Sequence, residues 1–96
     1  MIDVSLDHLQ LIRSILSRFV PEIEVRAFGS RVDGRSKPYS DLDLAIMTEK
    51  PLPPRTAALL SEAFSESDLP FKVDLVDWAE ISESFRKIIS EKNVIV

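Results

Sequence analysis

The residues of this chain with the clearest chemical potential are two carboxylates, Asp41 and Asp43, which lie two positions apart. They alternate with Leu42 and Leu44, a pattern typical of a β-strand with one apolar face. Residues two apart on a strand project from the same face, so both carboxylates would lie about 7 Å apart on the side away from the core. Two charges at that separation repel by about 2 kcal/mol at an effective dielectric constant of about 20.

A cation between the two carboxylates would remove this repulsion. The candidate ligands are all oxygen atoms, and the chain has no cysteine and one histidine, so the donor set favours Mg²⁺ or Mn²⁺. The alternative is the solvated polar face of an edge strand. Aspartate is depleted in strands, which makes two of them in one short strand unusual.

Asp74 is the candidate for a third carboxylate. It lies between Val73 and Leu75 in an apolar segment that predicts another strand. If this strand neighbours the first acidic strand, Asp74 would lie beside the pair; otherwise it is an ordinary solvated residue. Asp77 is a rival three positions further on, but it falls at the end of the predicted strand, so we favour Asp74.

A tight turn precedes the first carboxylate. The chain has only two glycines, Gly29 and Gly34, and glycine serves where a backbone must turn tightly or approach another group. At Gly29 and Ser30 a predicted strand passes into a helical turn, where backbone N–H groups and the serine hydroxyl would face an anion such as phosphate. A plain strand-to-helix turn would use the same residues. Three basic residues around the loop would either neutralise phosphates or be solvated: Arg31, Arg35 and Lys37.

The flanking sequence supplies the elements that must position these groups. Apolar residues at helical spacing predict a first helix over residues 6–19, with Ser5 as its N-cap and Pro21 closing it. The same periodicities predict, in chain order, strands over 23–28 and 41–46, a helix over 55–67, a strand over 71–76, a helix over 81–92 and a short apolar tail over 94–96 that forms an edge strand or a contact surface.

This order predicts a single α/β (α+β) domain over residues 1–96, with a small mixed sheet and helices packed on one side. The net charge of −4 argues against direct binding of nucleic acid, which needs a basic face. No apolar run reaches the roughly 18 residues of a membrane span, and the N-terminus has no basic n-region, so we expect neither a membrane span nor a signal peptide. The lack of cysteine fits a cytoplasmic protein.

The spacing of these residues resembles the signature of the nucleotidyltransferase superfamily that includes DNA polymerase beta. That signature is Gly-Ser, a second glycine five residues after the first, and Ser-Asp-x-Asp-Leu with its first aspartate twelve residues after the leading glycine. Most of the chain is similar to the minimal nucleotidyltransferases, the short single-domain branch with a polymerase beta palm-like fold. The matching residues are Gly29-Ser30, Gly34 and Ser40-Asp41-Leu42-Asp43-Leu44, and Asp74 matches a late aspartate.

The resemblance implies an activity and a partner. Many minimal nucleotidyltransferases are encoded beside a helical HEPN-domain protein and act as its antitoxin. The resemblance therefore implies Mg²⁺-dependent transfer of AMP from ATP to a side chain of that toxin, often a tyrosine, within a hetero-oligomer; the chain alone could form a homodimer. The implied nucleotide-binding residues are Gly29, Ser30, Arg31 and Ser40, and the implied catalytic and metal-binding residues are Asp41, Asp43 and Asp74.

Other functions are less consistent with the sequence. A non-catalytic antitoxin would neutralise its partner by docking alone, but a pure binding module has no physical use for clustered negative charge. Transfer to a small molecule, as in aminoglycoside-modifying relatives, would need a further helical domain that this chain lacks. RNA tailing meets the same objection, and the negative charge adds to it. The complete set of three aspartates therefore favours the enzyme.

Overall fold

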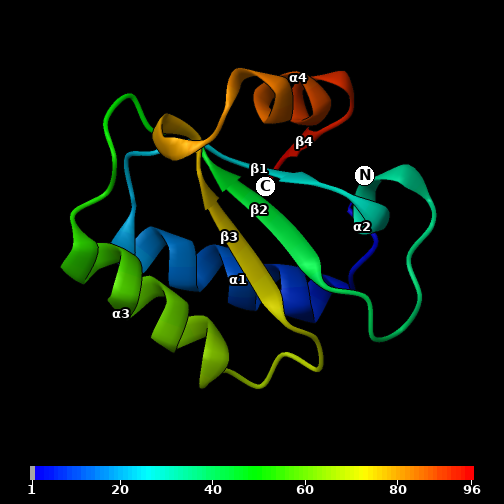
Figure 1. The fold of residues 1–96 in the computed structure, drawn as a ribbon. Helices are drawn as coiled ribbons and strands as arrows, with labels where there is room; N and C mark the ends of the chain where they lie inside the picture. Colours follow the sequence, from blue (N-terminus) through cyan, green and yellow to red (C-terminus); the bar gives the residue numbers. More distant parts are fainter. Residues whose placement is uncertain (1) are drawn as a thin grey trace.

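A four-stranded mixed sheet with helices on both faces forms the structure, a computed structural model that describes residues 2–96 (Figure 1). In chain order its elements are α1 (Leu6–Phe19), β1 (Val25–Phe28), α2 (Ser30–Asp33), β2 (Leu42–Ile46), α3 (Pro54–Ser65), β3 (Val73–Asp77), the 3₁₀-helix η1 (Trp78–Glu80), α4 (Glu83–Glu91) and β4 (Val94–Ile95).

The strand order is β3-β2-β1-β4. β1 is antiparallel to both β2 and β4, whereas β2 and β3 are parallel because α3 carries the chain back between them. The predicted mixed sheet is therefore confirmed, and the apolar tail does form an edge strand. Within residues 2–96, no helix combines the length and the apolar character needed to cross a lipid bilayer.

Local signals in the sequence set most of the element boundaries. The Ser5 hydroxyl accepts a hydrogen bond from the His8 backbone N–H and caps α1, as predicted. β1 begins two residues later than expected, because the Ile23 N–H donates to the Val20 carbonyl in a turn that follows α1. This local turn thus shortens a strand whose alternating pattern begins earlier.

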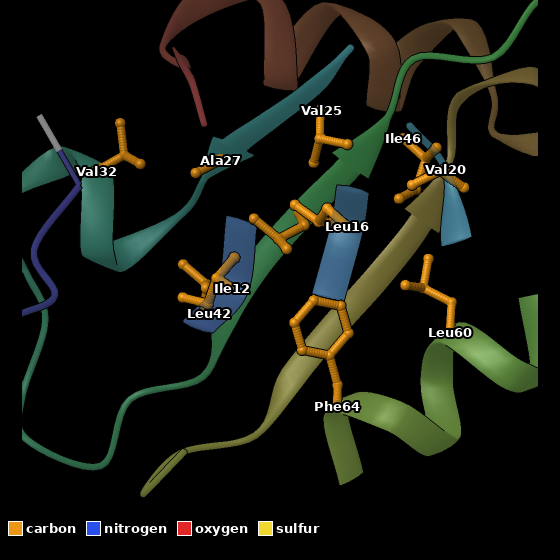
Figure 2. Close-up of a cluster of buried hydrophobic side chains, with 11 residues drawn as sticks. Ile12, Leu16, Val20, Val25, Ala27, Val32, Leu42, Ile46, Leu60 and Phe64 are labelled. Carbon is orange, nitrogen blue, oxygen red and sulfur yellow. The ribbon is translucent and has the colours of Figure 1, made fainter. Parts of the chain in front are cut away.

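The main core lies between the sheet and the pair α1 and α3. Figure 2 shows side chains from β1 and β2 packed against those of both helices. Burying each large apolar side chain stabilises the fold by about 1.5–3 kcal/mol. The buried members of this cluster are Ile12, Leu16, Val20, Val25, Ala27, Val32, Leu42, Leu44, Ile46, Leu60 and Phe64.

The opposite face of the sheet carries a second, smaller core, which corrects one expectation. We expected all helices on one side, but α4 packs on the face opposite α1 and α3 (Figure 1). Its Ile89 is 1% exposed and lies with Phe28 and Ala45, whose side chains alternate with those of the main core. The helical pattern of α4 shows that one side of it is buried, but it does not say against which face of the sheet.

Candidate active site

The parallel pairing of β2 and β3 brings two aspartates together. Asp43 and Asp74 are direct register partners, so their side chains leave the same face of the sheet on neighbouring strands. Leu42 and Leu44 alternate with Asp43 and are fully buried in the main core. The carboxylates therefore lie on the opposite face, the one that α4 covers in part.

The environment of Asp43 disfavours the negatively charged form of its carboxyl group. The residue is half-buried, and this burial raises the pKa of the Asp43 carboxyl above its ordinary value of 3.8. The nearby charges of Asp74 and then Asp41 raise this pKa further. A cation held among these groups would reverse all three effects, because it compensates the charge that they disfavour.

Asp41 directly precedes β2 and is exposed, as is Asp74. Across residues 2–96, no three acidic, histidine or cysteine side chains are already gathered closely enough to enclose a metal ion. Instead of the expected trio, the structure has a neighbouring pair, Asp43 and Asp74. Asp41 is an exposed third group, and its charge contributes to the raised pKa of the Asp43 carboxyl. To hold one ion among all three, these side chains would have to come closer together than they are.

Gly29 makes room for the Asp43 carboxylate. Its φ of 80° and ψ of −157° lie in a backbone region that is essentially confined to glycine. A Cβ atom at this position would lie 2.2 Å from Asp43 Oδ2, which is far inside van der Waals contact. The turn and the carboxylate are therefore packed against one another, and only glycine permits this approach.

The turn continues into α2, a single helical turn that begins at Ser30. The Gly29 carbonyl accepts from the N–H groups of Val32 and Asp33, at 3.0 and 3.1 Å. The first amides of such a turn have no partner within the helix, so they are available to an anion. Gly34 ends α2 in the left-handed conformation, with its N–H donating to the Ser30 carbonyl. Both glycines of the chain thus have a positive φ and bracket this turn.

Arg31 occupies a different environment from the one expected of a phosphate ligand. It is only 6% exposed, and its guanidinium group lies 4.1 Å from the centre of the Phe71 ring. Its Nε donates to the Ser40 carbonyl (2.8 Å), its Nη1 to that of Asp3 (2.8 Å) and its Nη2 to that of Pro38 (3.0 Å). The guanidinium is turned to the protein, which argues against the expectation that Arg31 binds the nucleotide.

The loop between α2 and β2 holds its own polar groups. The Ser40 hydroxyl accepts a hydrogen bond from the Lys37 backbone N–H at 2.8 Å, so its oxygen shapes the loop while its proton remains free to donate. Arg35 pairs with Asp33 at 2.6 Å, and this hydrogen-bonded partner lowers the pKa of the Asp33 carboxyl. Arg35, like Arg31, is therefore engaged by other groups of the protein.

Asp77 is excluded as the third carboxylate by its partners. It is paired in register with Ile46, whose side chain lies in the main core, so Asp77 belongs to the face opposite Asp43. Its carboxylate accepts hydrogen bonds from the Thr48 hydroxyl and from the N–H groups of Leu52 (2.7 Å) and Ala79. It therefore fastens the segments that follow β2 and β3, and Asp74 remains the partner of Asp43.

Two residues beside the site were not identified from the sequence. Phe71 resembled an ordinary strand residue, and Asp3 lay in a segment without a predicted element, yet both contact Arg31. A hollow of about 470 Å³ between β3 and α3 is lined by Asp74 but not by Asp43, Gly29 or Ser30. This hollow is therefore separate from the Asp43 carboxylate and from the glycine turn.

The comparison with known families defines the class of protein. Residues 9–96 match the family described as the nucleotidyltransferase domain. The chain belongs to this family, which agrees with the resemblance of the motif and with the mixed sheet described above. A nucleotidyl group is thus the group that such an enzyme transfers.

Individual relatives narrow the comparison. A curated protein of Haemophilus influenzae, described as a probable protein adenylyltransferase MntA, is 52% identical over 95 residues, which is 99% of this chain and 83% of the relative. A solved toxin–antitoxin structure with AMP-PNP has a TM-score of 0.75 at 24% identity, over 90% of this chain and 69% of the solved one. A Shewanella oneidensis structure, described as a tri-AMPylated HEPN toxin in complex with MNT antitoxin, has a TM-score of 0.67 at 23% identity, over 94% and 71% of the two chains. These two solved structures show the shared fold.

Proposed function

We propose that this protein is a metal-dependent protein adenylyltransferase that moves AMP from ATP to a HEPN-type toxin and thereby acts as its antitoxin. The proposal is carried by one observation: Asp43 and Asp74 lie in register on one face of the sheet, with Gly29 packed against Asp43. The relative with 52% identity is described as a probable protein adenylyltransferase, which supports the acceptor being a protein. The HEPN-type partner and the complex are proposed from the solved toxin–antitoxin structures that share this fold.

The residues present fit a divalent metal ion. Asp41, Asp43 and Asp74 supply only carboxylate oxygens, the ligands that Mg²⁺ and Mn²⁺ prefer. Burial and the neighbouring charges of Asp74 and Asp41 raise the pKa of the Asp43 carboxyl, and a bound cation would favour its charged form. When bound, such ions polarise the phosphate oxygens and stabilise the charge that develops during phosphoryl transfer.

The chain's own residues then have distinct tasks. The backbone of Gly29 and the N–H and hydroxyl groups of Ser30 would hold the triphosphate, with the Ser40 hydroxyl as a further donor. Asp74 is exposed, which suits a group that meets the acceptor hydroxyl of a second protein and orients or deprotonates it. The acceptor oxygen forms a bond to the α-phosphorus of ATP, the bond from that phosphorus to pyrophosphate breaks, and the acceptor proton passes to Asp74 or solvent.

Labelling with ATP tests this proposal. The protein is mixed with Mg²⁺, ATP labelled in its α-phosphate and the product of the neighbouring gene, which we expect to be the HEPN-type partner. We expect label on that partner with the unchanged chain and none with the Asp41→Asn/Asp43→Asn variant or with Asp74→Asn, because each loses ligands that the transfer needs. Asp77→Asn is the matched control, because this aspartate lies three residues from Asp74 on the opposite face; it should transfer normally once its folding is verified.

Two results would contradict the proposal. Unchanged labelling by the Asp41→Asn/Asp43→Asn variant would refute the site. Tight complex formation without any label on the partner would refute the catalytic function and favour neutralisation by docking alone. Complex formation is measured in the same samples by size-exclusion chromatography, so that the two results are separated.

A further inference from the structure

Arg31 is a buried cation whose hydrogen-bond acceptors are all backbone carbonyls and not carboxylates. Its three donor atoms reach backbone carbonyls, and its flat face lies on Phe71. Burying a charge is costly unless hydrogen bonds satisfy it, and here the carbonyls and the ring do so. Arg31 is only 6% exposed, so these contacts, rather than water, satisfy most of its hydrogen-bonding groups.

The segments that Arg31 joins are those that lead into the aspartates. Its Nε binds the carbonyl of Ser40, which belongs to the peptide bond directly before Asp41. Its planar group lies on Phe71, three residues before Asp74 on the neighbouring strand. Arg31 itself follows the Gly29–Ser30 turn, so one side chain connects the turn with the starts of both acidic strands.

The N-terminal segment completes this arrangement. The Asp3 N–H donates to the Arg31 carbonyl at 2.7 Å, and Arg31 Nη1 donates to the Asp3 carbonyl at 2.8 Å. The Asp3 carboxylate in turn accepts from the hydroxyl of Ser36. The backbone and the side chain of Arg31 thus each form a hydrogen bond with the backbone of Asp3. The Asp3 carboxylate is in turn bonded to the loop that precedes β2.

The start of the two strands is fixed at one more point. The Leu42 N–H donates to the Lys72 carbonyl at 2.9 Å, which begins the parallel ladder between Asp41 and Asp43 on one side and Asp74 on the other. Loss of the Arg31 contacts would free the residues on both sides of this bond. The spacing of the carboxylates depends on how these two strands begin, because Asp41 directly precedes β2 and Asp43 and Asp74 lie near the starts of β2 and β3.

From this geometry we propose that Arg31 is a positioning residue, which sets the separation of Asp41, Asp43 and Asp74 and leaves nucleotide phosphates to the turn. The inference rests on the proposed metal-dependent function. A lysine at this position would keep the charge but lose the planar fork that binds three carbonyls and stacks on the ring. Loss of a phosphate ligand would raise KM for ATP, whereas loss of a positioning residue would weaken metal binding and lower kcat.

Binding of Mn²⁺ alone tests the inference, measured as the loss of the free-ion signal in electron paramagnetic resonance. We expect Arg31→Lys to weaken Mn²⁺ binding by about 10–100-fold, the range found when a group that supports metal ligands is removed. The kcat of transfer should fall with it, while KM for ATP changes little, because the turn that holds the triphosphate is intact. Circular dichroism and thermal unfolding establish that the variant is folded under the conditions used.

Arg86→Lys is the matched control. The Arg86 guanidinium also donates to a backbone carbonyl, that of Trp78, through Nε and Nη2, and lies 5.2 Å from the Trp78 ring. It belongs to α4 and touches neither acidic strand start, so we expect unchanged Mn²⁺ binding. If Arg31→Lys does not fold, Phe71→Leu removes only the ring beneath the guanidinium and should still weaken Mn²⁺ binding and lower kcat.

The possible failures are distinguishable. Equal Mn²⁺ affinity and kcat in Arg31→Lys and the unchanged chain would overturn the positioning role. So would a rise in KM for ATP in Arg31→Met that Arg31→Lys does not show, since that result identifies a phosphate ligand. If the unchanged chain and Asp43→Asn bind Mn²⁺ equally, the metal site of the proposed function fails instead.

Discussion

The face of the sheet that carries the aspartates has two contrasting ends. At one end α4 covers it, and Ile89 packs on Ala45 and Phe28 with almost no exposure. At the other end, two residues before Ala45 on β2, the half-buried Asp43 lies beside the glycine turn, with the exposed Asp74 next to it on β3. Both ends obey the same alternation of side chains, so the difference comes from what covers them.

On this face of the sheet, the residues that stabilise the fold and the residues of the candidate site thus lie at different ends. The covered end contributes free energy of folding by removing apolar area from water. The open end costs free energy, because Asp43 is charged in a half-buried place beside two like charges. Three substitutions should break or sharpen this comparison, and they follow in order of the effect expected.

Ile89→Ala should give the largest change in stability. Removal of most of a fully buried side chain from the covered end lowers the free energy of unfolding by about 2–5 kcal/mol. Mn²⁺ binding by the folded protein should change little, since the open end is untouched. Urea unfolding and a Mn²⁺ titration measure the two quantities.

Ile88→Ala is the control for this change, because Ile88 is its neighbour on α4 but 63% exposed. It should alter the free energy of unfolding by no more than about 0.5 kcal/mol. Similar losses from both substitutions would show that α4 does not cover the sheet in the way described.

Gly29→Ala should act on both properties at once. The new Cβ would meet Asp43 Oδ2, and the backbone conformation is one that alanine avoids, so we expect a loss of about 1–3 kcal/mol in the free energy of unfolding. Mn²⁺ affinity should fall as well, because the carboxylate must move away. Urea unfolding and a Mn²⁺ titration again measure both.

Gly34→Ala provides the comparison for Gly29→Ala. Gly34 has a φ of 85°, but a Cβ there meets nothing within 4 Å. Alanine should cost about 1–2 kcal/mol in backbone strain alone and should leave Mn²⁺ binding as it was. A matching drop in Mn²⁺ affinity from both substitutions would mean that the contact with Asp43 is irrelevant to the site.

Asp43→Asn should give the smallest change in stability, of opposite sign and dependent on pH. Because the folded protein raises the pKa of the Asp43 carboxyl above 3.8, the folded state binds this proton more tightly than the unfolded state does. The carboxylate therefore costs no stability below pH 3.8, and the cost appears as the pH rises through the raised pKa. In metal-free buffer Asp43→Asn should then be the more stable protein at neutral pH, by less than about 1 kcal/mol after solvent screening.

The measurement is urea unfolding of both proteins with a chelator, in acid and at neutral pH. The gain should disappear in acid, where the carboxyl of Asp43 is protonated in both states. A gain that is equal in acid and at neutral pH would show that it arises from packing and not from charge.

The sequence predicted this site better than it predicted the residues that support it. Spacing alone indicated that Asp41 and Asp43 share a face, and the register of Asp74 agrees with that arrangement. The prediction that all helices lie on one side was wrong for α4, because a helix with one apolar stripe packs equally well on either side of a sheet. The burial of Arg31 was also missed, because arginine is normally exposed and its acceptors are backbone carbonyls that leave no trace in the sequence.

The parallel pairing of β2 and β3 has a consequence for how the protein is made. Asp43 and Asp74 come from strands separated by all of α3, so a chain that has emerged from the ribosome only as far as β2 carries half of the acidic pair. Competence to hold an ion would arise in a single step, when the crossover closes and the last strands join the sheet. An incompletely synthesised or partly unfolded copy would then be inert, and the neutralising activity that we propose would track the number of finished molecules.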